Sequence, residues 1–156
     1  LLHDHLKTIS PMAEALLFIA GRIQLVEEYI RPALRRGQIV VCDRFHDATV
    51  AYQGFGGGLK IQWLDRLGRT AIGCVLPQLT IFLDVPTRVG FARLKGPKDR
   101  MERKRLAFHR RVLFGYRRLA RQEPRRVLVV DGTQPPDVVQ AKIRAAVWKR
   151  LSRSRD

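Results

Sequence analysis

The segment Ile39-Val40-Val41-Cys42-Asp43-Arg44-Phe45 decides the predicted fold. Its run of β-branched residues follows Gly37 and is typical of a buried parallel strand. In open α/β sheets, ligands bind beyond the carboxyl ends of such strands, where Asp43 and Arg44 lie. A carboxylate there can hold hydrated Mg²⁺, and a guanidinium can bind phosphate oxygens bidentately. The same pair also suits a helix N-cap Asp and a surface Arg, so chemistry alone leaves both interpretations open.

Working outward, the pattern predicts alternating helices and strands in a single domain over residues 1–150, followed by a basic tail at 151–156. We expect strands at 39–42, 79–84 and 127–130. We expect a long helix from Pro11 to Gly37, capped by Ser10 and divided at Pro32, and a short helix near 46–53. Further helices are expected around Leu59, Trp63 and Leu67, from Pro86 and from Pro136. Another is expected over 103–122, and its inward positions are Leu106, Val112, Leu113, Tyr116 and Leu119.

Charge is the unusual feature of the composition. Thirty Lys and Arg against fourteen Asp and Glu give a net charge of +16, above the magnitude of roughly 2 to 8 that suits a small soluble domain. An anionic partner is therefore expected, and nucleotides, nucleic acid and acidic membranes all fit the sign. Cys42 and Cys74 lack metal-ligand spacing, which makes a reducing cytosol the default. We find no signal peptide and no apolar run long enough to cross a membrane.

Four motifs occur in an order that points to one family. They are Phe18-Ile19-Ala20-Gly21-Arg22, Glu27-Glu28-Tyr29-Ile30-Arg31-Pro32-Ala33-Leu34, Asp43-Arg44-Phe45 and Ala51-Tyr52-Gln53-Gly54. From about Leu16 to Val147 the chain resembles thymidylate kinase of the bacterial type. The resemblance implies an α/β, P-loop-kinase-type parallel sheet flanked by helices, a cytoplasmic enzyme, and a homodimer in the complete protein.

The family's phosphate-binding loop is the main departure. No Gly-x-x-x-x-Gly-Lys occurs in the chain, and the cluster Gly54-Phe55-Gly56-Gly57-Gly58 lacks the Lys. We therefore expect a family member incomplete at its N-terminus, with three strands remaining and little activity alone. In the family the missing strand lies between those expected at 39–42 and 79–84. These two should pair directly, accept a strand from another chain, or leave the chain marginally folded.

The resemblance assigns a substrate site. Phe18 and Arg22 lie four residues apart on one helix face; an aromatic at this spacing is more often core, but by resemblance Phe18 stacks on thymine and Arg22 addresses its carbonyl edge. Thr49 would hydrogen-bond the base, Tyr52 would disfavour a ribose, and Gln53 would support both.

The remaining assignments concern phosphates and metal. By resemblance, Asp43 and Arg44 are catalytic, with Arg44 also binding dTMP and Asp43 holding Mg²⁺ through water. Residues 93–102 resemble a mobile lid, although a solvated basic turn is the plainer interpretation. Its Arg93, Lys95 and Arg100 would contact ATP, with Arg93 and Arg100 catalytic.

The segment Asp131-Gly132-Thr133-Gln134 resembles the loop bordering adenine, which makes Gly132 and Thr133 ATP-binding candidates. Two positions depart from the family pattern: Gly57 stands where Arg is common, and Phe45 replaces the commoner Tyr.

The implied reaction is Mg²⁺- and ATP-dependent phosphorylation of dTMP to dTDP, a step toward dTTP. A deoxynucleoside kinase is the nearest enzymatic alternative, since it also places an acidic residue and Arg after a core strand. A non-catalytic, basic nucleic-acid-binding remnant is the alternative from another class. The chain shows no aromatic-interleaved basic strand, which argues against nucleic acid.

Overall fold

The computed structural model describes residues 9–94 and 101–152. The predicted fold class is confirmed, because the structure is α/β with a parallel sheet flanked by helices. The described residues form two compact units, one containing residues 9–76 and 101–115, the other residues 77–94 and 116–152. Helix α6 (Leu106–Gln122) contributes to both.

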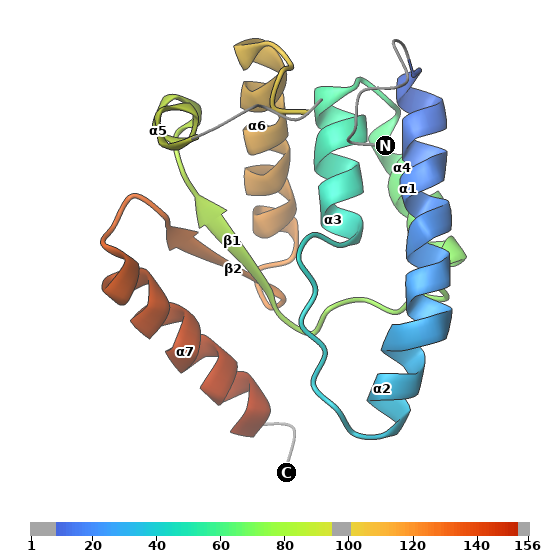
Figure 1. Cartoon of the computed structure of the whole chain (residues 1–156), viewed down its shortest axis with the longest axis vertical. Coiled ribbons are helices and arrows are strands. Elements are labelled where there is room, and N and C mark those ends of the chain that lie inside the picture. The colour runs from blue at the N-terminus through green and yellow to red at the C-terminus, as the bar shows by residue number, and fades with distance from the viewer. Residues whose placement is uncertain (1–8, 95–100, 153–156) are drawn as a thin grey trace. The chain divides into compact units, whose positions relative to one another are not determined.

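The first unit opens with a long helical stretch made of α1 (Pro11–Leu25), a π-helical turn η1 (Val26–Ile30) and α2 (Arg31–Arg35), seen in blue in Figure 1. The predicted cap is present: the Ser10 hydroxyl accepts a hydrogen bond from the Ala13 amide at 3.2 Å.

The division predicted at Pro32 takes the form of the wider π turn just before it. Proline has no N–H, and its ring crowds the carbonyl four residues earlier. The Arg31 amide reaches back to the Val26 carbonyl, so the backbone bonds are kept by widening the turn. Gly37, at φ +70°, then terminates the stretch in the left-handed conformation.

The strand predicted at 39–42 is wrong. These residues are not in a ladder; among the described residues the sheet contains two strands, β1 and β2, and not three. Val40 packs on a core cluster that includes Val26 and Phe45, whereas Ile39 and Val41 are 69% and 93% exposed. The segment keeps a strand's alternation but has no neighbouring backbone to bond, and direct pairing with β1 does not occur.

The short helix predicted after Arg44 is confirmed. It consists of α3 (His46–Thr49) continued by a π-helical segment η2 (Val50–Gly56), and α4 (Ile61–Ala71) follows. Helices α1, α3 and α4 pack on one another, with a core of Ala15, Ile19 and Leu64. This packing faces α1 toward α3 and η2.

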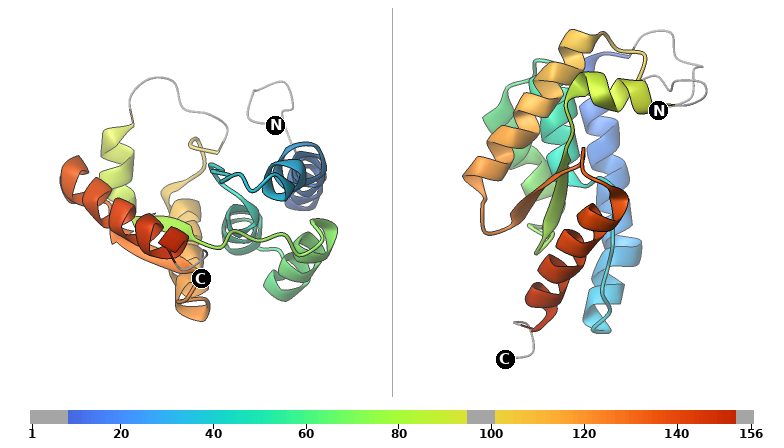
Figure 2. Two further views of the ribbon diagram at one scale, coloured as in Figure 1. Left: turned by 90° about the horizontal axis from the view of Figure 1, so that it is seen from below. Right: turned by 90° about the vertical axis from the view of Figure 1, so that its left-hand side faces the viewer.

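The second unit contains the sheet. Strands β1 (Thr80–Asp84) and β2 (Val127–Asp131) run parallel, close to the strands expected at 79–84 and 127–130. Helix α5 (Thr87–Arg93) follows β1, and α7 (Pro136–Ser152) packs along β2, as the views of Figure 2 show.

Side chains join α6 to β1 in this unit. The Arg117 guanidinium binds the Asp84 carboxylate through Nε and Nη2, each at 2.9 Å from one oxygen, and the rings of Tyr116 and Phe82 stack at 5.2 Å. None of the helices within residues 9–94 and 101–152 combines the length and apolar composition that a membrane crossing requires.

A buried histidine network fixes α3 on α4. His46 is 1% exposed, and its Nε2 lies 2.9 Å from Oδ1 of Asp65, which also accepts from Nε of Arg69 at 2.9 Å. Gly68 makes room for the ring, since a Cβ there would lie 2.1 Å from Cε1 of His46. Nδ1 has no hydrogen-bond partner within the described residues. Burial lowers the pKa of His46, and the bond to Asp65 opposes this only in part.

This network predicts a pH-dependent stability. Because the folded pKa lies below the unfolded value of about 6.5, the unfolded chain binds more protons as the pH falls through 6.5. The free energy of unfolding should therefore drop by up to about 1.4 kcal/mol per pH unit below 6.5, until the folded pKa is reached. Urea titrations of wild type and His46→Phe between pH 7.5 and 5 measure this, and the variant should show a shallower slope. Equal slopes would mean that His46 does not titrate differently in the two states.

Candidate active site

Two predicted substrate residues contact each other across α1 and α3. Nη1 of Arg22 donates to Oγ1 of Thr49 at 2.7 Å, and the Arg22 guanidinium lies 5.3 Å from the ring centre of Phe45. Thr49 is 2% exposed. Phe18 is half-buried one turn before Arg22 on α1. The structure thus brings the predicted base-binding residues of the two helices to one place, with the guanidinium held between a hydroxyl and an aromatic face.

A second contact crosses the same two helical segments and involves a residue that the sequence reasoning missed. Nε2 of Gln53 donates to Oε2 of Glu14 at 2.9 Å, and the residues are 2% and 6% exposed. Glu14, Phe18 and Arg22 are spaced by four along α1, a pattern that could have revealed Glu14. From the sequence alone, however, its place in the first helical turn indicates only a dipole-stabilising acid.

Arg44 stands at a strained position. Its φ is +62°, in the left-handed region that residues other than Gly, Asn and Asp rarely adopt. Its guanidinium lies 5.2 Å from the ring centre of Tyr52, which itself packs edge-on against Phe108 at 6.1 Å. Strain of this kind clusters at functional sites. The cation–π contact also joins two residues that were predicted to belong to the site, Arg44 and Tyr52.

Asp43 is exposed beside Arg44. The part of the chain that the structure describes holds no group of three His, Cys, Asp or Glu side chains arranged as a metal site. Mg²⁺ keeps several waters and is usually bound by one or two carboxylates together with substrate phosphates. A single exposed carboxylate fits that mode and does not fit a closed protein cage.

The second unit brings together three of the predicted ATP-binding residues. Nη1 of Arg93 donates to the carbonyl of Gly132 at 2.7 Å. The backbone N–H and hydroxyl of Thr133 bind Oδ1 of Asp131 at 2.9 and 2.6 Å, and these bonds, with one from Gln134, lower the pKa of Asp131 to about 2. Arg93 thus contacts the backbone of the loop that follows β2. The predicted residues Lys95 and Arg100 lie outside the described residues.

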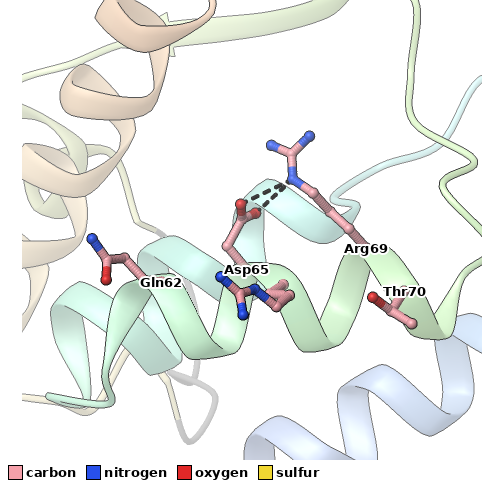
Figure 3. A pocket seen from close by; sticks show the side chains of 5 residues that line it. Gln62, Asp65, Arg69 and Thr70 are labelled. Carbon is pink, nitrogen blue, oxygen red and sulfur yellow. Dashed lines mark hydrogen bonds and ion pairs between the residues drawn. The ribbon is translucent and has the colours of Figure 1, made fainter.

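Two surface pockets of the first unit lie elsewhere. An open pocket of about 540 Å³ lies over α4. Among its lining residues, Arg69 binds both oxygens of Asp65 (Figure 3). A second, of about 480 Å³, runs between the η1–α2 turns and the segment 39–42. Neither pocket is lined by the predicted substrate residues. Of these residues, Arg22 bonds Thr49, and Gln53 bonds Glu14.

The backbone of Arg44 yields a stability prediction. Replacing it with Gly should relieve about 1 to 2 kcal/mol of left-handed strain, against losses of about 0.5 to 1 kcal/mol each for glycine entropy and the cation–π contact. Arg44→Gly should therefore unfold in urea close to wild type. The control Arg66→Gly, at an exposed position in the middle of α4, should lose about 1 kcal/mol. A loss for Arg44→Gly as large as in the control would contradict the strain.

Comparison with known proteins places this geometry in a family. The family model described as thymidylate kinase matches residues 1–143. A thymidylate kinase of Thermomicrobium roseum is 47% identical over 152 residues, covering 96% of this chain and 72% of the relative. Those of Synechococcus sp. (strain JA-2-3B'a(2-13)) and Deinococcus radiodurans are each 46% identical, covering 94% and 91% of this chain and 71% and 70% of the relatives. The chain therefore belongs to the thymidylate kinase family, a family of phosphotransferases.

Proposed function

We propose that the face shared by α1, α3 and η2 is the dTMP site of a kinase that transfers the γ-phosphoryl group of ATP to dTMP, giving dTDP. The observation that carries this proposal is the pair of hydrogen bonds, Arg22 to Thr49 and Gln53 to Glu14, that bracket Phe18. They place both hydrogen-bond donors and hydrogen-bond acceptors around an aromatic ring, and recognition of a flat, polar base requires both.

Each residue has a task in this proposal. Phe18 stacks on the thymine ring. A guanidinium carries five N–H donors, so Arg22 can bond Thr49 and a base carbonyl together. Thr49 accepts from Arg22 and keeps its own O–H to donate. Tyr52, held between Arg44 and Phe108, lines the sugar end and disfavours a ribose.

Arg44 and Asp43 serve the phosphate end. Arg44 binds the dTMP phosphate through its planar donor fork, and Asp43 holds Mg²⁺ through a water molecule. The ion, when bound, neutralises charge on the phosphates of ATP. Phosphoryl transfer depends mainly on such positioning and charge, so the protein's contribution here is to orient the accepting phosphate.

ATP is assigned to the second unit. Gly132 and Thr133 border adenine in this proposal, supported by the rigid Asp131 turn and by the Arg93 bond to Gly132. A Cβ at Gly132 would lie 2.5 Å from Cγ2 of Val85, so the loop backbone stays close to the strand end. Lys95 and Arg100 are proposed, with Arg93, to contact the phosphates as a lid closes.

We further propose a cytoplasmic homodimer. Cys42 and Cys74 are free and exposed, which suits a reducing compartment. Helix α1 leaves large apolar side chains exposed, namely Met12, Leu16, Leu17 and Ile23. An apolar stripe of this kind suits a subunit interface, and sedimentation velocity measures whether the chain self-associates.

A binding experiment tests the base site. In thermal unfolding, dTMP should protect the chain more than UMP or AMP at equal concentration, because a ligand that binds only the folded state stabilises it by mass action. Phe18→Ala should lose this preference. Phe114→Ala, an exposed aromatic in the same unit, is the matched control and should keep it. Equal shifts for all three nucleotides in wild type would leave only general anion binding.

A second measurement concerns turnover. The 156 residues contain no Gly-x-x-x-x-Gly-Lys loop to cradle the β- and γ-phosphates. We propose that this chain by itself binds dTMP without turning over efficiently, at well below about 1 per second. A coupled assay with ATP, Mg²⁺ and dTMP measures the rate. Turnover within the ordinary kinase range would contradict the proposal.

A further inference from the structure

Glu14 has an environment that a helix-dipole role does not require. Helix α1 is already capped by Ser10, and an acidic residue in a first turn can stabilise the dipole while fully solvated. Glu14 is instead 6% exposed and faces η2, where it accepts from Gln53. Burying a carboxylate costs free energy unless the carboxylate is well hydrogen-bonded. The helix dipole alone therefore does not explain why Glu14 is buried and bonded to Gln53.

The spacing of the two contacts places this pair beside the base site. Glu14, Phe18 and Arg22 repeat every four residues on α1, and Thr49 and Gln53 are four apart on the facing helix. Figure 1 shows α1 and α3 side by side, in agreement with their packing contacts. Arg22 bonds Thr49 on one side of Phe18, and Glu14 bonds Gln53 on the other. Along α1, Phe18 therefore lies between the residues that make the two contacts.

The chemistry of the pair fixes which end of that amide is presented. A carboxylate only accepts hydrogen bonds, so the amide nitrogen of Gln53 must face Glu14. The amide oxygen, Oε1, then lies on the opposite side of the group. Without Glu14, the nitrogen and oxygen could exchange places, since a carboxamide is nearly symmetric in shape.

We propose that Glu14 is a positioning residue that orients the Gln53 amide so that Oε1 accepts a hydrogen bond from the N3–H of thymine, selecting thymine over cytosine. This inference rests on the proposed dTMP site. Thymine carries a donor at N3, whereas cytosine carries an acceptor there. An acceptor facing an acceptor leaves both unpaired in a buried site, and this disfavours dCMP.

The test compares affinities for dTMP and dCMP by isothermal titration calorimetry at pH 7. In Glu14→Gln the residue can donate as well as accept, so Gln53 can turn its nitrogen toward the base. The ratio of dTMP to dCMP affinity should fall about tenfold. The matched control is Glu28→Gln: Glu28 accepts from Gln24 in an exposed pair of the same chemistry, and this variant should keep the wild-type ratio.

A swapped pair keeps the test decisive if Glu14→Gln does not fold. In the double variant E14Q/Q53E, residue 14 donates to a carboxylate at 53, whose second oxygen still presents an acceptor to the base. The preference for dTMP should survive there. An unchanged ratio in folded Glu14→Gln, or a lost preference in the swapped pair, would overturn the inference. If wild type fails to bind dTMP at all, the proposed function fails instead, and that result is read from the wild-type titration alone.

Discussion

The register between α1 and the α3–η2 helix is the constraint on which the rest of the site depends. Two side-chain hydrogen bonds set it, Arg22 to Thr49 across 27 residues and Gln53 to Glu14 across 39. A slip of one helical turn, about 5.4 Å, would leave buried polar groups without partners, at about 1 to 3 kcal/mol for each. Apolar packing, such as that of Ala15 against Leu64 of α4, holds α1 in the core but does not set its register against α3 and η2. The polar pairs therefore decide where Phe18 stands.

The backbone turn at Arg44 connects this helix register to the residues proposed to bind the phosphate. A left-handed residue turns the chain from the extended segment 39–42 into α3, so that Phe45 enters the core while the Arg44 side chain returns over Tyr52. Phe45 packs with Val26 in the core and also lies under the Arg22 guanidinium. One backbone turn thus couples the core to the proposed base and phosphate ends of the site, which explains why a strained conformation is kept at a charged residue.

How far the sequence predicts this structure depends on whether a feature is local. The cap at Ser10, the disturbance at Pro32 and the two paired strands follow from short patterns, and all were predicted. The strand at 39–42 was not formed because a ladder needs a neighbour, which no local pattern supplies. The contact of Glu14 was not predicted because its partner, Gln53, lies 39 positions away in the sequence. The bond from Arg93 to Gly132 likewise joins distant segments, so the sequence suggested both residues but not their contact.

The proposed site residues between Asp43 and Gln53 are charged and exposed at one end and neutral and buried at the other, in the order of the two ends of a nucleoside monophosphate. Asp43 and Arg44 lie in solvent, while Thr49 and Gln53 are each 2% exposed. A phosphate is costly to dehydrate and is best met by charges that remain partly hydrated, whereas a base loses little on entering a dry site that pairs its polar edge. The net charge of +16 can attract any polyanion. In the proposed site, selectivity among nucleotides must therefore come from the buried end, where hydrogen-bond direction decides which base is accepted.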